Sequence, residues 1–220
     1  QGKLIVIGAG KASARMAEAV EAHYGPCAGC VVTRYGYERP TQGIEILSAA
    51  HPVPDQAGVL ATQRIVQSVQ NLSPDDLGIA LISGGGSALL CAPVSGVSLD
   101  DKMALTQQLL DSGAAIDEIN TVRKTLSLVK GGKLAQACAP ARVVNLLISD
   151  VPGDDPEFIA SGPTVPSRIT ARQAMDILDR WNITLPDHMR QAMAAYVCPD
   201  LEMTRISAHI IASPMVSLQA

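Results

Sequence analysis

Short aliphatic runs alternate with longer amphipathic stretches along the chain. Each run is bounded by glycine, proline or polar residues, which is typical of buried strands. The stretches between the runs carry apolar residues at helical spacing. Strands are therefore predicted at residues 4–8, 30–33, 44–49, 77–83, 141–149 and 205–213. Helices are predicted at residues 11–23, 56–71 (with Asp55 as N-cap), 98–112, 115–128, 170–180 and 186–196, with another beginning after Gly132.

The alternation of strands and helices predicts an α/β fold. Helices that cover both faces of a parallel sheet explain why the strands are so uniformly apolar. The chain ends at Ala220, directly after the last predicted strand, where a crossover helix is expected. It begins at Gln1 rather than at a methionine. We therefore expect one domain over residues 1–220, truncated at both ends.

The composition narrows the class of function. Of 220 residues, 47% are hydrophobic and 17% are charged, which is typical of a folded soluble protein. A net charge of −4 supplies no basic field for nucleic acid, and no apolar run approaches the roughly 20 residues of a membrane span. Five scattered cysteines indicate reduced thiols and a cytoplasmic location. Cys27 and Cys30 form a C-x-x-C pair, but no second pair completes a zinc site, which favours buried thiols.

Candidate chemistry begins at the turn after the first strand, in the segment LIVIGAGKASAR. A P-loop requires the pattern G-x-x-x-x-G-K-[ST]. Gly10 and Lys11 fit its end, but Ile5 replaces the first glycine and Ala12 replaces the hydroxyl that would hold magnesium. The P-loop interpretation therefore fails at two required positions.

A dinucleotide site requires G-x-G-x-x-G and an acidic residue after the second strand. Gly8 and Gly10 match this pattern, but Ser13 stands at the third glycine. Arg34 ends the second strand where a ribose-binding carboxylate is expected, although an arginine there would suit a 2′-phosphate. An NADP site is weakened by these differences but stays open.

The remaining interpretation is an anion-binding turn. Backbone N–H groups at a helix N-terminus attract anions, and Lys11 adds a mobile positive charge. A surface lysine beside a structural glycine turn is the alternative. The segment ISGGGSALL repeats the arrangement after the fourth predicted strand, because Gly84, Gly85, Gly86 and Ser87 let backbone amides approach an anion closely. We interpret this second turn as a phosphate-binding nest.

A basic cluster follows in the segment NTVRKTLSLVKGGKLA. Arg123, Lys124, Lys130 and Lys133 lie close together in a net-acidic protein, which indicates an anionic ligand. Arg123 and Lys130 are spaced to lie on one face of a helix. A solvated helix face is the alternative.

Carboxylates follow the fifth predicted strand in the segment ISDVPGDD. Asp150, Asp154 and Asp155 stand there, and ligands of parallel sheets bind beyond the carboxyl ends of the strands. These carboxylates suit Mg²⁺, whose other ligands are waters and substrate phosphates, although helix capping is an equally good role for one of them. Ser161 and Thr164 add polar groups in the same loop. Anion-binding turns, cations and carboxylates together indicate phosphoryl transfer, in which catalysis is mainly positioning and neutralisation of charge.

Taken in order, these segments resemble the class II glycerate kinases, the MOFRL-associated or DUF4147 family. The matching stretches cover nearly the whole chain: VIGAGKASARMAEAVE, SAAHPVPDQAG, LISGGGSALL, INTVRKTLSLVKGGKLA and LLISDVPGDDPEFIASGPTVP. The resemblance implies a Rossmann-like, doubly wound, mainly parallel sheet with helices on both faces. It also implies phosphoryl transfer from ATP to the 2-hydroxyl of D-glycerate, with Mg²⁺ or another divalent metal. The smaller C-terminal MOFRL domain of the family, which shares the active site, is expected to be absent from this chain.

The same resemblance assigns roles to residues. Thr125 stands where relatives often carry histidine, so the role of that position is open. The implied catalytic contacts are Lys11, Arg123 and Asp150, the nucleotide-phosphate contacts are Gly84, Gly85, Gly86, Ser87 and Lys130, and the metal ligands are Asp150 and Asp154.

Two other functions stay open. An older label of the family names an NAD(P)H-dependent hydroxypyruvate reductase, in which Lys11, Arg123 and Lys130 would bind a carboxylate. His51 would then be the candidate acid, and a turn-stabilising histidine is the alternative. A phosphate nest can also bind its ligand without chemistry, as in a sensor domain. The expected partner is a small hydroxy acid, with no nucleic acid and no membrane, and a homodimer is compatible with the sequence.

Overall fold

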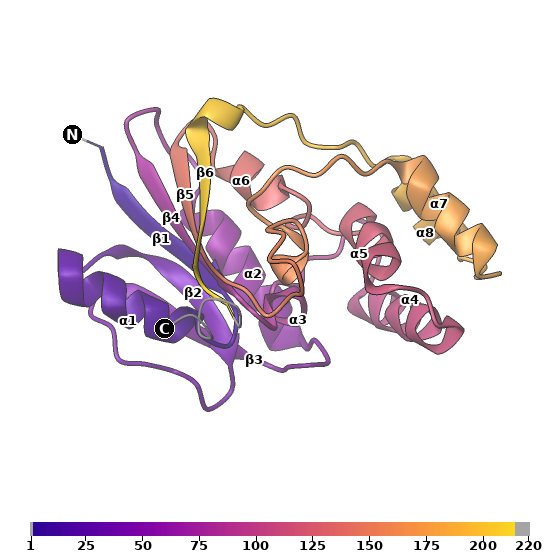
Figure 1. The fold of residues 1–220 in the computed structure, drawn as a ribbon, viewed down its shortest axis with the longest axis horizontal. Helices are drawn as coiled ribbons and strands as arrows, with labels where there is room; N and C mark the ends of the chain where they lie inside the picture. The colour runs from indigo at the N-terminus through magenta and orange to yellow at the C-terminus, as the bar shows by residue number, and fades with distance from the viewer. Residues whose placement is uncertain (1, 214–220) are drawn as a thin grey trace.

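A parallel six-stranded sheet forms the centre of the molecule, and the computed structural model describes residues 2–213 (Figure 1). The strand order is β3-β2-β1-β4-β5-β6, and every neighbouring pair is parallel. The order reverses between β1 and β4, which is where open α/β sheets bind ligands. The strands are β1 (Leu4–Ala9), β2 (Ala28–Arg34), β3 (Ile44–Ala49), β4 (Leu77–Ser83), β5 (Arg142–Ile148) and β6 (Ile206–Ala212).

Alternate residues of the central strands enter different hydrophobic cores. In β1, Ile7 belongs to the core under α2, whereas Val6 belongs to the core under α1. In β4, Ile82 and Leu81 divide in the same way, because successive side chains of a strand point to opposite faces. Helices therefore cover both faces, and the predicted doubly wound α/β fold is confirmed. The helices against the sheet are α1 (Ser13–Tyr24), α2 (Gln56–Ser68), α3 (Gly86–Leu89) and α6 (Lys133–Cys138).

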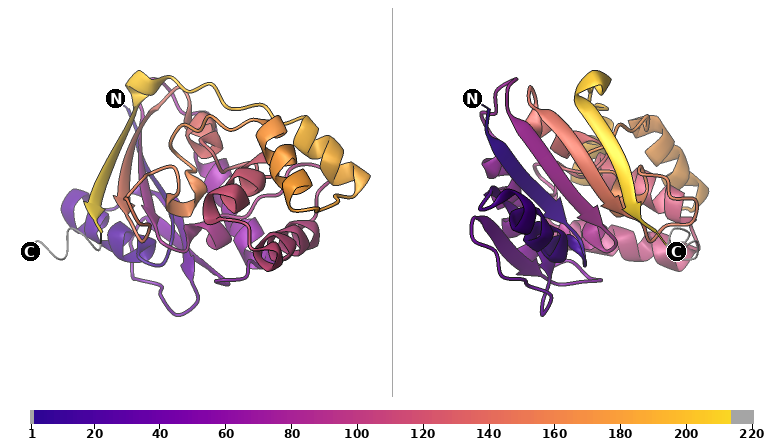
Figure 2. Two further views of the ribbon diagram at one scale, coloured as in Figure 1. Left: turned by 45° about the vertical axis from the view of Figure 1, so that its right-hand side comes forward. Right: turned by 60° about the vertical axis from the view of Figure 1, so that its left-hand side comes forward.

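A second group of helices stands beside the sheet, at the right of Figure 1 and again in the left view of Figure 2. These helices have a core of their own, to which Leu109, Ile119 and Met193 contribute fully or almost fully buried side chains. We call this group the helical unit. It consists of α4 (Leu99–Ser112), α5 (Ile116–Thr125), α7 (Ala171–Arg180) and α8 (Asp187–Ala194).

Most predicted elements are confirmed, and Asp55 caps α2 by accepting a hydrogen bond from the Gly58 N–H at 2.9 Å. The prediction of one helix over residues 115–128 is wrong at its C-terminal end. Beyond Thr125 the chain pairs with another segment, because the Leu128 N–H donates to the Ala92 carbonyl at 2.9 Å.

Three short elements were not predicted, because a run of three or four residues carries no periodic signal. They are α3 and the 3-10 turns Ile159–Ser161 and Met203–Arg205. The expected truncation depends on the two termini, Gln1 and Ala220. Both lie outside the described residues, so the truncation stays a prediction. None of the helices within residues 2–213 has the length and apolar character that a bilayer crossing needs.

Candidate active site

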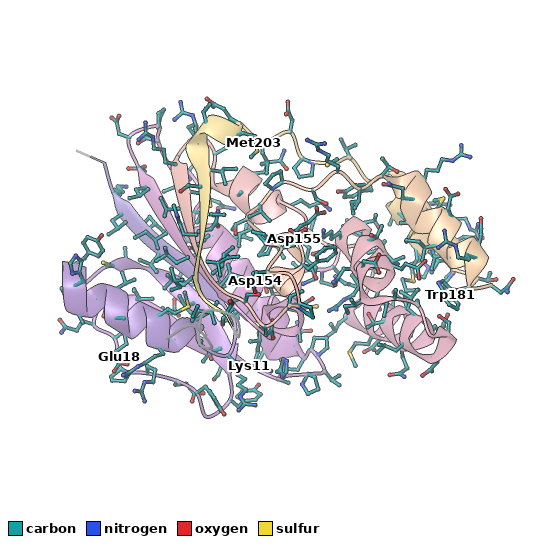
Figure 3. The ribbon with its side chains drawn as sticks, in the orientation of Figure 1. Lys11, Glu18, Asp154, Asp155, Trp181 and Met203 are labelled. Atoms are coloured by element: carbon teal, nitrogen blue, oxygen red, sulfur yellow. The ribbon has the colours of Figure 1, made fainter. Side chains whose placement is uncertain are left out.

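The turns that follow β1 and β4 meet at the reversal of strand order. The Lys11 N–H donates to the Gly84 carbonyl at 2.9 Å, and the Ala12 N–H donates to Ser83 Oγ at 3.0 Å. Gly10 is needed here, because a Cβ at this position would lie 2.1 Å from Ser83 Oγ. In Figure 3, Lys11 lies near the end of the sheet to which the strand arrows point. The two glycine turns singled out in the sequence therefore form one structure.

We call residues 84–87 the glycine turn. Three side chains pack against it so closely that a side chain on the turn would displace them. A Cβ on Gly84 would lie 2.0 Å from Oδ2 of Asp150. A Cβ on Gly85 would lie 3.0 Å from Nε2 of His51 and 3.1 Å from Cε of Lys11. The consecutive glycines thus let a lysine, a histidine and an aspartate converge on the turn.

The backbone of this turn has free donors. The N–H groups of Gly85, Gly86 and Ser87 donate to no other group within residues 2–213. Gly85 adopts a left-handed conformation with φ of 81°, and a left-handed residue next to helical ones makes successive N–H groups converge into an anion-binding nest. The turn therefore has the geometry that an anionic oxygen requires.

The surroundings of His51 favour its neutral form. Burial lowers the pKa of its imidazole, the positive charges of Lys11 and Arg34 lower that pKa further, and the Asp150 carboxylate opposes them. A neutral imidazole can accept a proton from a hydroxyl group. The sequence offered His51 as a candidate acid or a turn-stabilising residue, and in the structure its ring lies against Gly85.

Two of the predicted cations converge on the C-terminal end of α3. Lys130 Nζ donates to the carbonyls of Ser87 at 2.7 Å and Leu90 at 2.8 Å, and Arg123 Nη2 donates to the same Ser87 carbonyl at 3.3 Å. The spacing predicted that the two side chains share one face of a helix. This prediction is wrong, because α5 ends before Lys130. Burial and the charges of Arg123 and Lys102 lower the pKa of Lys130 well below its usual range.

The other two predicted cations serve the fold. Lys124 is 2% exposed, and its ammonium pairs with Glu157 at 2.7 Å. Lys133 donates to the backbone carbonyls of Lys124 and Ser127. The basic cluster of the sequence therefore divides into two groups, and only Arg123 and Lys130 lie beside the glycine turn.

A chain of side-chain hydrogen bonds joins the glycine turn to the helical unit. Ser87 Oγ lies 2.8 Å from Ser161 Oγ, which donates to Oδ1 of Asn120 at 3.0 Å. Ala160 and Ser161 both have positive φ, of 53° and 64°, and such strained backbone persists only where its surroundings enforce it. The Gly131 N–H enforces it here by donating to the Ser161 carbonyl at 3.1 Å. Ser161 was a predicted polar contact, whereas Asn120 was not predicted, since an asparagine within a helix carries no signal of its own.

The two carboxylates predicted to hold a metal are free to do so. Asp150 is exposed and Asp154 is half-buried, and neither forms an ion pair among the described residues. Within residues 2–213 there is no cluster of three or more metal-binding side chains. One or two carboxylates together with phosphate oxygens are, however, the usual protein contribution to a Mg²⁺ site. Asp150 and Asp154 fit that more limited role.

A cavity of about 500 Å³ opens between α3 and the helices α4 and α5. Ser87, Arg123 and Lys130 line it, together with Lys102 from α4 and the segment after His51. A larger hollow of about 620 Å³ lies between α5 and α7. None of the residues of the glycine turn lines that second hollow, so the smaller cavity is the relevant one.

Comparisons with known proteins match the chain to one family. The family model described as a domain of unknown function, DUF4147, matches residues 1–194. A protein of Agrobacterium vitis named "Putative hydroxypyruvate reductase" is 49% identical over 100% of this chain, which covers 51% of that protein. The D-glycerate 2-kinase of Thermotoga maritima is 44% identical over 87% of this chain, which covers 46% of that protein.

A solved structure agrees with these matches. The crystal structure of glycerate kinase from Thermotoga maritima superposes with a TM-score of 0.90 at 40% identity, covering 96% of this chain and 51% of that one. The chain therefore spans about half the length of the curated relatives that it matches.

Proposed function

The chain belongs to the DUF4147 family, and from this premise we propose that it is the N-terminal, Rossmann-like domain of a glycerate 2-kinase. The reaction is ATP-dependent phosphoryl transfer to the 2-hydroxyl of D-glycerate. Relatives named glycerate 2-kinase at 40% and 44% identity support this reaction. In this proposal a second domain outside residues 1–220 completes the active site. We place the enzyme in the cytoplasm, where its five unpaired cysteines stay reduced. A homodimer stays a prediction.

The observation that carries the proposal is the convergence of Lys11, His51 and Asp150 on the glycine turn. Phosphoryl transfer needs cations and backbone donors around the moving group, because charge spreads over its oxygens. Lys11 and the free N–H groups of Gly85, Gly86 and Ser87 supply both beside one turn. These are the elements that a kinase active site requires.

Each group has a role in this mechanism. Lys11 neutralises the charge on the transferring phosphoryl group, and the N–H groups of the glycine turn hold its oxygens. His51, whose neutral form burial and nearby cations favour, accepts the proton of the attacking hydroxyl. Arg123 contributes positive charge beside Ser87.

Asp150 and Asp154 would hold Mg²⁺, which supplies further neutralisation of phosphate charge when bound. Both carboxylates lie after β5, on the loop that reaches the glycine turn. They would supply carboxylate ligands, and phosphate oxygens and water would complete the coordination.

A coupled assay tests the proposed function. The full-length protein is incubated with ATP, MgCl₂ and D-glycerate, and ADP release is followed. Phosphorus NMR of the product distinguishes phosphorylation of the 2-hydroxyl from that of the 3-hydroxyl. We expect glycerate-dependent ADP release and the 2-phosphate. Absence of turnover, or formation of the 3-phosphate, would contradict the proposal.

Hydroxypyruvate reduction is the second candidate, because the Agrobacterium relatives carry that name. The geometry gives it less support. Ser13, where a dinucleotide site has its third glycine, is fully buried, and its hydroxyl donates to the Leu81 carbonyl at 2.8 Å. Titration with NADPH, followed by nicotinamide fluorescence, separates the two candidates, since a kinase gives no enhancement.

A further inference from the structure

Positive charge without a carboxylate partner surrounds the cavity beside α3. Lys102, Arg123 and Lys130 all line it. Among the described residues none of the three forms an ion pair. Burial of charge is costly unless the charge is paired. Arg123 and Lys130 donate to backbone carbonyls, but within residues 2–213 no carboxylate balances the charge of the three side chains, which indicates that an anion does so.

Lys102 is the most informative of the three. Its side chain is 7% exposed, and its ammonium has no hydrogen-bond partner among the described residues. Lys133 provides a contrast, because its ammonium is also withdrawn from water but donates to two backbone carbonyls. The burial of Lys102 is therefore not offset by the hydrogen bonds that stabilise the Lys133 ammonium. A role in the fold alone does not explain it, since an apolar side chain would fill the same space at lower cost.

Part of the cavity wall is apolar. Val53, Leu110 and Ile116 line it, and they are 56%, 54% and 65% exposed. A volume of about 500 Å³ is far more than a three-carbon hydroxy acid fills. Its ligand therefore combines an anionic group with a larger, less polar body.

We propose that this cavity binds the nucleoside polyphosphate of the kinase reaction, with Lys102 as a phosphate contact and the exposed apolar wall against the nucleoside. The inference rests on the proposed function. A lysine stem is flexible, and its rotation brings the ammonium from the wall to the phosphates. The hydroxy acid is left with the Lys11, His51 and Asp150 side of the glycine turn.

The test replaces Lys102 with residues of similar shape in the full-length protein. Lys102→Met removes the charge and Lys102→Arg retains it. Lys133→Met is the matched control, because it removes a half-buried lysine whose ammonium already donates to two backbone carbonyls. Dissociation constants for ADP and ATP are measured by calorimetry, KM for D-glycerate is measured kinetically, and melting temperatures are measured without ligand.

We expect Lys102→Met to melt at a higher temperature than wild type and to bind ADP about tenfold to hundredfold more weakly. Lys102→Arg should retain most of the affinity, and the KM for glycerate should be unchanged in both variants. Lys133→Met should melt lower without a specific loss of ADP affinity. A higher melting temperature together with weaker ADP binding in Lys102→Met distinguishes a ligand contact from a structural residue.

Two results would overturn the inference alone: wild-type ADP affinity in Lys102→Met, or a raised KM for glycerate with unchanged ADP affinity. The second result would assign the cavity to the hydroxy acid. A wild-type protein that binds neither ADP nor ATP would overturn the inference together with the proposed function.

Proton uptake provides an independent readout. Lys102 faces the thiol of Cys91 and the positive charges of Arg123, Lys130 and Lys133, and burial lowers its pKa to about 8. Phosphate binding should raise this pKa, so wild type should take up more protons than Lys102→Met when ADP binds above pH 8. Calorimetry in buffers of different ionisation enthalpy measures the difference, and equal uptake would contradict the proposed contact.

Discussion

The glycine turn and the cavity beside α3 are adjacent, yet they are built in different ways. The turn is backbone, and its fit depends on the absence of side chains at Gly84 and Gly85. The cavity is built from side chains of two units, with Lys130 after α5 and Lys102 on α4. The turn tolerates no added atom, whereas the cavity has space and unbalanced charge. Substitutions at the turn should therefore affect catalysis most, and substitutions at the cavity should affect binding and stability.

The largest effect is expected at the turn itself. Gly84→Ala places a Cβ 2.0 Å from Oδ2 of Asp150, so Asp150 or the turn must move. Misplacement of a reacting group and loss of one electrostatic contact each cost about 10²-fold or more in kcat, so a loss of about 10³-fold is expected. The measurement is kcat for glycerate phosphorylation, with circular dichroism to verify folding. Gly78→Ala is the control, because its backbone is not left-handed and a Cβ there would approach the Arg142 carbonyl oxygen only to an ordinary 3.5 Å. A folded Gly84→Ala enzyme with normal kcat would refute the close packing.

Lys11→Met should have the next largest effect. Its ammonium acts on the transferring group, so kcat should fall about 10²-fold while the dissociation constant for ADP changes little. Lys3→Met serves as an exposed control on the same strand segment. A loss of ADP affinity with unchanged kcat would instead indicate a domain that binds phosphate without catalysis.

Lys102→Met should increase stability, in contrast to both substitutions at the turn. Burial lowers the pKa of Lys102 from 10.5 to about 8, which corresponds to roughly 3 kcal/mol of stability lost below pH 8. The unfolded chain holds this proton more tightly, so wild-type stability rises with pH between these two pKa values. Urea denaturation should show the advantage of Lys102→Met below pH 8 and its decline toward pH 10.5. An advantage that does not change with pH would have another cause.

The smallest effect is expected where the buried charge is paired. Burial alone would raise the pKa of Glu157, but hydrogen bonds from Lys124 and Ser167 outweigh it and lower that pKa. Glu157→Gln should cost about 2 kcal/mol at neutral pH. The cost should shrink as the pH falls through the lowered pKa of Glu157, because protonation then removes the same charge from wild type. Urea denaturation at several pH values measures it, and no change in ADP affinity should accompany it.

The turn was predictable from the sequence, and the cavity was not. Both bounds of β3 and of β4 were predicted correctly, because buried strands leave continuous aliphatic runs that end in recognisable turns. Lys11 and Gly84 belong to turns after neighbouring strands, and parallel topology brings such turns to one edge. Lys102 gave no signal, since a lysine on an amphipathic helix normally faces solvent. Only the packing of α4 against residues far along the chain withdraws it from water.

The basic cluster illustrates the same limit. Four cations in one segment predicted a shared ligand, but Lys124 and Lys133 are engaged by Glu157 and by backbone carbonyls. Sequence spacing gave the wrong geometry for Arg123 and Lys130, because the helix ends between them. Their convergence on the Ser87 carbonyl depends on tertiary contacts that no local pattern encodes.

The buried hydroxyl of Ser13 limits what this fold can be redesigned to do. It donates to the Leu81 carbonyl and lies 3.3 Å from Ser83 Oγ, so its hydroxymethyl group fills the space that a glycine would leave vacant at the start of α1. Conversion into a nicotinamide-dependent enzyme would have to begin with Ser13→Gly. That change would remove a tie between α1 and β4, and the scaffold would lose rigidity before it gained a coenzyme.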